Sequence, residues 1–306
     1  MYKMNNNSKT FMTMKKNVLK RLLSCVAMAT CVLTAHAADR LLIVGEAVWG
    51  GWSIDNSVVM LNNESEPDVF KATVQLKETG TFKFLTTTDW GNLEYRAGDN
   101  DVTLSEGEAA ALVSTDENSN DKQFRVSQTA NYDIVCDLAA KTIVVTKSAY
   151  QTNAVNHTAL WMVGSATPGG WSIGDAVMLT ADASNPVVFK ATADLVAGEL
   201  KFAVNKHTGW GQTFYLRDVT DEHKMVFGGD DNKWNIQQAG TYDITVDVVG
   251  MTISIAEHTA SGIDAAQVAP VGHTEYYGLN GMRLTAPQAG QVCLKKEGKR
   301  VVKVLR

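Results

Sequence analysis

A five-residue segment occurs twice in this chain. Gly50-Gly51-Trp52-Ser53-Ile54 returns as Gly169-Gly170-Trp171-Ser172-Ile173. The interval, about 119 residues, is the length of a small domain and exceeds the roughly 20- to 50-residue period of a solenoid. The match extends to four further pairs of segments: 69–73 with 188–192, 82–84 with 200–202, 90–91 with 210–211, and 132–134 with 242–244. The sequence therefore predicts two duplicated domains.

Both copies have the pattern of short β-strands. Residues 41–44 and 160–163 are apolar runs that end at glycine, which is typical of buried strands. Residues 82–84 and 132–136 alternate apolar with polar side chains, and no helical period of useful length appears. Several short strands in about 100 residues favour a sandwich. We therefore predict an all-β protein with two tandem immunoglobulin-like β-sandwich domains and a small C-terminal β module.

The N-terminal residues have the order of a secretory signal peptide. Four basic residues precede an apolar run at 22–33; they are Lys15, Lys16, Lys20 and Arg21. Ala35-His36-Ala37 then offers a small-residue cleavage site. The alternatives are a buried N-terminal helix and a lipoprotein acylated at Cys25 or Cys31, although neither cysteine follows a good small-residue box. We expect an exported protein whose signal peptide spans residues 1–37.

The remaining chain divides by composition into four parts. We predict the first sandwich at 38–147, a polar linker at 148–159, the second sandwich at 160–258, and a spacer followed by the basic β module at 259–306. Cys136 and Cys293 lie in different parts, so no disulfide framework is expected.

Composition and charge narrow the function. The chain is 45% hydrophobic and 20% charged with a net charge of −5, which is ordinary for a globular protein and gives no reason to expect nucleic acid. The six histidines are scattered and form no metalloprotease motif, and no nucleophile elbow occurs. The acidic stretch 116–121 lacks the turn glycine and closing glutamate of an EF-hand and is expected to be a solvated loop. We therefore predict no catalytic residues, no metal and no cofactor.

Four tryptophans stand in loop-like sequence. Trp52 and Trp171 follow paired glycines, and Trp90 and Trp210 precede a glycine in polar stretches. Core tryptophans more usually sit in alternating strands, as Trp161 and Trp234 do, so we expect the four loop rings to be exposed. The other interpretation is that each ring plugs one end of a sandwich. An exposed ring with polar neighbours suits a sugar, whose C–H face covers the ring.

Polar partners for a sugar can be proposed beside these rings. Alternation points the lysine of each repeated strand away from the core, and an arginine follows the tyrosine of the next strand in each repeat. Each of these could equally be a solvated surface residue. The candidate carbohydrate-binding residues are Trp52, Lys83, Trp90, Tyr95, Arg96, Trp171, Lys201, Trp210, Tyr215, Arg217 and Asn232.

The repeated motifs resemble the SusE and SusF family of starch-binding outer-membrane proteins. The resemblance rests on the Gly-Gly-Trp-Ser-Ile segment, the Phe-Lys-Phe strand, the Trp-Gly loop and the Tyr-Asp-Ile strand. It implies carbohydrate-binding β-sandwiches that hold an α-glucan against two rings, with Trp52 and Trp90 in one site, Trp171 and Trp210 in the other, and Lys83 or Lys201 as the cation. Lys206 competes with Lys201 for that role.

The resemblance also implies a location and partners. It predicts a non-catalytic protein at the outer-membrane surface or outside the cell, in contact with a glycan-uptake complex. Family members are usually lipid-anchored and have more domains, and this chain lacks a good lipobox. Residues 277–306 instead look like the sorting domain of the type IX secretion system; the alternative is a basic module without a sorting role.

Two other functions compete with glycan binding. A structural or adhesive surface protein could use the tryptophan loops to contact another protein. An unrecognised hydrolase would release reducing sugar from the polymer, which we do not expect.

Overall fold

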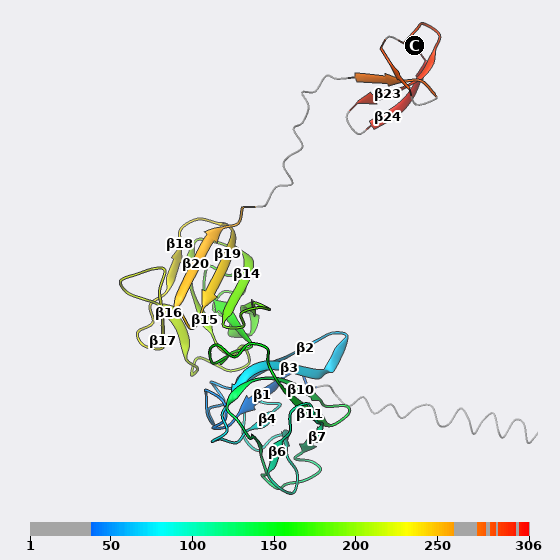
Figure 1. Ribbon diagram of the computed structural model, residues 1–306. Coiled ribbons are helices and arrows are strands. Elements are labelled where there is room, and N and C mark those ends of the chain that lie inside the picture. Colours follow the sequence, from blue (N-terminus) through cyan, green and yellow to red (C-terminus); the bar gives the residue numbers. More distant parts are fainter. Residues whose placement is uncertain (1–37, 260–273, 280–281, 286, 298–299, 306) are drawn as a thin grey trace, which may run out of the picture. The chain divides into compact units, whose positions relative to one another are not determined.

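A computed structural model describes residues 38–259, 274–279, 282–285, 287–297 and 300–305 (Figure 1). The predicted signal peptide lies outside these residues. Throughout the described ranges the secondary structure is strand and turn, with one short 3-10 helix, so the all-β prediction is confirmed. No helix in these ranges is long and apolar enough to cross a membrane. The chain separates into two compact units at residues 256 and 257, and each unit is described by itself.

The first repeat is a nine-stranded sheet with one additional parallel pair. The sheet has the order β7-β11-β10-β3-β2-β1-β4-β5-β8, and β6 pairs with β9. Its strands are β1 (Leu41–Val44), β2 (Val58–Asn63), β3 (Glu66–Leu76), β4 (Lys83–Leu85), β5 (Glu94–Arg96), β6 (Val102–Leu104), β7 (Ala110–Ala111), β8 (Val113–Ser114), β9 (Phe124–Val126), β10 (Ala130–Asp137) and β11 (Thr142–Lys147).

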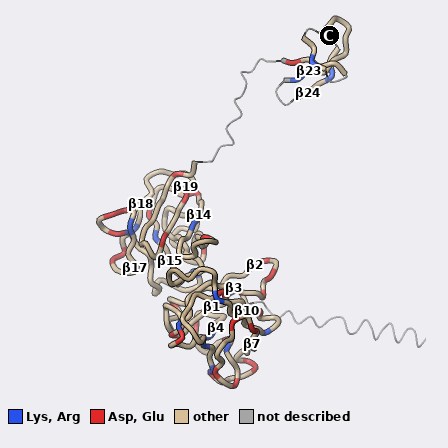
Figure 2. The backbone as a smooth tube through the Cα atoms, in the orientation of Figure 1, with Lys and Arg blue, Asp and Glu red and all other residues tan. Residues whose placement is uncertain are grey.

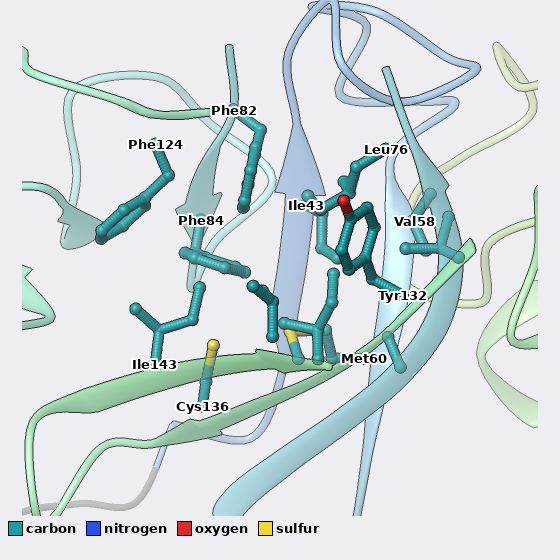
Figure 3. Packing of buried hydrophobic residues seen from close by; sticks show 14 of the residues in the cluster. Ile43, Val58, Met60, Leu76, Phe82, Phe84, Phe124, Tyr132, Cys136 and Ile143 are labelled. Atoms are coloured by element: carbon teal, nitrogen blue, oxygen red, sulfur yellow. The ribbon is translucent and has the colours of Figure 1, made fainter. Parts of the chain in front are cut away.

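This sheet forms a sandwich because its two halves enclose one core. The β2–β3 register shifts between Leu61 and Asn63, an irregularity of the kind that bends a strand. Figure 3 shows Phe84 on one layer facing Cys136 and Ile143 on the other. The inward positions of β1, β3, β4, β10 and β11 are nearly all apolar, so the predicted alternation is the physical cause of the layering.

The second repeat has the same plan. Its sheet has the order β17-β16-β15-β12-β13-β14-β19-β20, with β18 paired to β15. Its elements are β12 (Ala159–Val163), the 3-10 helix η1 (Ile173–Asp175), β13 (Val177–Ala181), β14 (Val188–Leu195), β15 (Gly198–Ala203), β16 (Phe214–Arg217), β17 (Met225–Phe227), β18 (Trp234–Ile236), β19 (Gly240–Asp247) and β20 (Thr252–Glu257).

The two repeats share a third buried cluster, which lies on the outer faces of corresponding strands. On the first repeat Leu42 pairs with Leu85, and on the second Trp161 pairs with Ala203 at the equivalent positions. Because β1 and β12 are covered on both faces, they have the continuous apolar runs seen in the sequence. The cluster consists of Leu42, Val44, Val59, Leu85, Ala159, Trp161, Val163, Ile173, Ala203, Phe214 and Leu216.

The segment between the repeats is packed against both of them. The His157 ring is buried between Trp49, Tyr215 and Phe227, and its Nε2 lies 3.0 Å from the Tyr215 hydroxyl. Trp49, from the first repeat, packs against the core of the second. The predicted linker is therefore part of the packed junction.

The second unit contains one small antiparallel sheet in the order β22-β21-β23-β24. Its strands are β21 (Thr274–Tyr277), β22 (Arg283–Leu284), β23 (Val292–Glu297) and β24 (Arg300–Leu305).

Candidate functional site

A glycine-dependent turn carries the first tryptophan of each repeat. Gly51 and Gly170 have φ angles of 58° and 57°, which favour glycine. A Cβ on Gly50 would lie 2.1 Å from the Asn56 carbonyl oxygen, and one on Gly169 would lie 2.2 Å from that of Asp175. The paired glycines therefore allow a tight turn, and the duplicated motif gives the same turn twice.

Each turn brings its tryptophan to the Trp-Gly loop of the same repeat. The ring centroids of Trp52 and Trp90, the first aromatic pair, are 6.3 Å apart with an interplanar angle of 52°. Those of Trp171 and Trp210, the second aromatic pair, are 6.2 Å apart at 53°. Trp90, Trp171 and Trp210 are 48%, 39% and 51% exposed, whereas Trp52 is half-buried. The repeats thus present two tilted ring pairs of the same geometry.

A lysine lies beside each pair. Lys83 Nζ is 5.9 Å from the Trp52 ring centroid and 5.3 Å from that of Trp90, and Lys201 Nζ is 5.0 Å from that of Trp210. All three distances suit a cation–π interaction. Alternation placed these lysines on the outer face of the sheet, yet they are only 5% and 6% exposed. The buried lysines therefore contact the tryptophan rings and are shielded from solvent.

Ion pairs hold Lys83 in the first repeat. Its Nζ lies 2.8 Å from Glu94 and 3.0 Å from Asp121. Arg96 donates to the same Glu94 oxygen through Nε at 2.9 Å and Nη2 at 2.7 Å. Glu94 is almost fully buried, while the Asp121 side chain is 55% exposed. Most of this network is therefore buried, and one carboxylate is left at the surface.

The neighbouring cations lower the pKa values of Glu94 and Asp121. Burial alone would raise the pKa of Glu94, but hydrogen bonds from Lys83 and Arg96 outweigh it and bring that pKa below its usual value. The pKa of Asp121 is lowered in the same way, against its desolvation, by Lys83 and Arg96. Both groups are therefore ionised at neutral pH.

The second repeat replaces part of this charge with an aromatic ring. Phe214 pairs with Ala203 as Glu94 pairs with Leu85, so Phe214 occupies the position of Glu94. The Phe214 ring stacks on Trp210 at 5.6 Å and 22°, and Lys201 Nζ lies 4.1 Å from its centroid.

Asp231 binds the lysines of the second repeat. Its carboxylate is 2.7 Å from Lys201 and 3.0 Å from Lys233, and these contacts lower its pKa, the hydrogen bond from Lys201 most. Lys233 also approaches the Trp171 ring, at 5.9 Å. This site is more aromatic than the first and has the same exposed carboxylate.

Four of the predicted site residues make other contacts. Tyr95 packs against the core of the first repeat, and Tyr215 is buried in the second, where it contacts His157. Arg217 donates to the carbonyl oxygens of Lys233 and Asp218. Asn232 donates to the Asp230 carbonyl at 3.3 Å. Their side chains complete the fold around the sites, whereas Trp52, Lys83, Trp90 and Arg96, and Trp171, Lys201 and Trp210, are brought together.

Sequence analysis missed the two surface carboxylates. Asp121 precedes Phe124 by three positions, as Asp231 precedes Trp234, so the repeat itself carried the signal. The acidic stretch was expected to be solvated throughout, but Asp121 binds Lys83. Within the described ranges no cluster of three or more His, Cys, Asp and Glu side chains could hold a metal ion.

Comparison with known proteins bears mainly on the second repeat. The family model of SusF/SusE starch-specific CBMs matches residues 159–257. Among solved structures, the crystal structure of SusF from Bacteroides thetaiotaomicron is 16% identical with a TM-score of 0.31, and the match covers 86% of this chain and 56% of that one. No curated protein matches. The second repeat is thus similar to the starch-specific carbohydrate-binding modules of SusF and SusE.

Proposed function

We propose that this protein is a non-catalytic glycan-binding protein that holds starch-like α-glucans on its two aromatic pairs. The observation that carries the proposal is the equal geometry of the pairs, 6.3 Å at 52° and 6.2 Å at 53°, at exposed positions of both repeats. Two rings tilted toward each other match a curved glucan better than a flat one, because each ring covers the face of a different sugar unit.

The surrounding charges supply the polar contacts. The exposed oxygens of Asp121 and Asp231 accept hydrogen bonds from sugar hydroxyls, while the buried lysines hold the rings and carboxylates in place. Acidic and basic residues are interspersed over the first unit (Figure 2), which suits an uncharged ligand.

Each site alone binds weakly. Covering about 100 Å² of apolar area per ring at ~25 cal/mol/Å² contributes about 2.5 kcal/mol. After the cost of association, two rings and a few hydrogen bonds leave roughly −4 to −5 kcal/mol, a dissociation constant near the millimolar range. Two sites on one chain strengthen binding to a polymer through effective concentration.

Affinity electrophoresis through a gel that contains amylopectin tests the proposal. The unmutated protein is retarded, and Trp52→Ala with Trp171→Ala abolishes the retardation. Val249→Ala is the control, because this side chain is 46% exposed and belongs to neither pair. A wild-type mobility that amylopectin leaves unchanged would contradict glycan binding and favour an adhesive protein whose tryptophan loops contact another protein.

The proposal includes a location. An exported protein that binds starch acts at the outer-membrane surface or outside the cell, beside a glycan-uptake complex, and residues 277–306 serve as the type IX sorting domain that their sequence resembles. Because the protein is not an enzyme, incubation with amylopectin releases no reducing sugar; release would identify a hydrolase.

A further inference from the structure

The loop that carries Trp210, residues 205–213, is held from inside by one glutamine. Gln212 Oε1 accepts the backbone N–H groups of Val204 and Asn205, each at 2.8 Å. Its Nε2 donates to the carbonyl oxygens of Asn205 at 2.7 Å and Gly209 at 3.0 Å. These bonds close the loop but do not fix it on the body of the protein.

The first repeat supplies the external attachment. The backbone N–H of Thr213 donates to Asn56 Oδ1 at 2.8 Å, and Asn205 Nδ2 donates to Ser57 Oγ at 2.9 Å. Thr208 Oγ1 donates to the carbonyl oxygen of Asp55 at 3.2 Å. Asp55, Asn56 and Ser57 follow directly on the turn that carries Trp52. The second loop is therefore bonded to the turn of the other repeat.

The Asn205–Ser57 contact is buried, and the contacts of Asn56 and Asp55 are partly buried. Ser57 is 1% exposed and Asn205 is fully buried, so losing one partner leaves the other unsatisfied, at a greater cost than a surface bond. A Cβ on Gly211, next to Trp210, would lie 2.5 Å from Asp55 Oδ2. The approach of the two segments leaves little room for the loop to shift.

The corresponding loop of the first repeat is attached differently. The Thr86 N–H and hydroxyl donate to the Leu93 carbonyl, and Thr115 Oγ1 donates to the Asn92 carbonyl, all within the first repeat. The second repeat has Gly174-Asp175-Ala176 where the first has Asp55-Asn56-Ser57. Asp175, at the position of Asn56, instead accepts from Ser172 Oγ at 2.8 Å within its own turn.

We propose that the second aromatic pair is a composite of both repeats, in which Asn56 and Ser57 of the first repeat are positioning residues for Trp210. The inference rests on the proposed function, since it assigns a role in glycan binding to residues that touch no glycan. The second repeat then needs the first to hold its ligand at full strength, whereas the loop that carries Trp90 is bonded to residues of its own repeat.

The test uses the full chain with Trp90→Ala, which removes the exposed ring of the first pair. In this background Asn56→Ala weakens binding of maltoheptaose about tenfold by calorimetry, because the Thr213 N–H loses its acceptor. Asn56→Asp keeps an acceptor oxygen at that place, now from a carboxylate, and restores binding. Asn63→Ala is the matched control: its Oδ1 accepts backbone N–H groups of Ser65 and Glu66 in another turn of the same repeat.

Hydrogen exchange of residues 205–213 provides a readout that does not depend on the sugar. Asn56→Ala speeds exchange in this loop, and Asn56→Asp and Asn63→Ala do not. Equal exchange and equal affinity in Asn56→Ala and its parent would overturn the inference. Faster exchange in a protein that binds no maltoheptaose in any variant would support the positioning role and reject the proposed function. An unchanged circular dichroism spectrum shows that Asn56→Ala is folded.

Discussion

At the scale of single residues, the two sites differ most at one position. Glu94 in the first repeat and Phe214 in the second occupy equivalent places beside a lysine. Glu94 accepts from Lys83 and Arg96 in a nearly dry environment, whereas Asp121, the other carboxylate near these cations, is 55% exposed. Phe214 supplies no charge at this position, and Lys201 is compensated by its ion pair with Asp231.

Glu94→Gln should therefore destabilise the protein strongly. The substitution leaves two buried cations with half of their compensating charge, and we expect a loss of about 3 kcal/mol in the free energy of unfolding, measured by urea denaturation. Glu66→Gln, which breaks the exposed pair with Lys71, is the control and should have no measurable effect. Equal effects of the two substitutions would contradict this account of the first site.

The buried His157 predicts a pH dependence. Burial lowers the pKa of His157 from 6.5 to about 3. As pH falls below 6.5 the unfolded chain takes up a proton that the folded protein does not, so the stability present above this pH is lost by ~1.4 kcal/mol per pH unit. In urea denaturation we expect His157 to contribute this slope once the pH is well below 6.5, and His157→Gln to flatten the total by that amount; His207, whose pKa burial lowers to about 4, adds a slope of its own. A slope unaffected by the substitution would assign the effect to other groups.

At the scale of elements, the paired-glycine turn determines where each ring pair forms. The Gly169 position has no room for a Cβ, because the Asp175 carbonyl stands 2.2 Å away, whereas a Cβ on Gly174, in η1 nearby, would meet nothing within 4 Å. The turn and the outward lysine could both be predicted from the sequence, because repetition and alternation are local signals.

Gly169→Ala should disrupt the second aromatic pair. The added methyl group forces the turn apart, which we expect to cost about 2 kcal/mol and to abolish amylopectin retardation when Trp90→Ala has removed the first pair. Gly174→Ala should leave both properties unchanged. Retention of binding by Gly169→Ala would show that the ring pair forms without this turn.

The sequence could not place every candidate at the site. Tyr95 pairs with Phe84 on the neighbouring strand, so the two side chains lie on the same face of the sheet. Lys83 is next to Phe84 and points to the opposite face. The alternation that makes Lys83 an outward residue therefore makes Tyr95 an inward one. Arg217 was matched to Arg96 across one insertion, but pairing gives that position to Leu216. Asp121 and Asp231 lay in loops, where no periodicity assigns a direction.

At the scale of the whole molecule, the two repeats are joined by a continuous apolar cluster that neither could bury alone. These surfaces could not be paired from the sequence, because the apolar runs 41–44 and 160–163 predict strands covered on both faces without indicating what covers them. Trp161 is 1% exposed and belongs to this cluster, whose members come from both repeats. We therefore expect residues 38–256 to unfold as one cooperative unit.

Trp161→Ala tests this coupling. Loss of a buried indole should cost about 3–5 kcal/mol and lower the midpoint of a single thermal transition. Hydrogen exchange should show both repeats losing protection together. Two separate transitions, with the first repeat unaffected, would show that the repeats fold independently. Cutting the chain between the repeats is a poorer experiment, since it would expose the shared cluster to water.

Because of Trp49, the two repeats cannot exchange places in the chain. Its ring fills a place against the core of the second repeat, while Pro168 stands at the matching position of the other copy. A chain with two copies of the second repeat would lack the indole that packs at the junction. A third copy placed after the second repeat would likewise meet Pro168 in place of a tryptophan. The two repeats have the same plan, but the residues at their junction differ, so one repeat cannot replace the other.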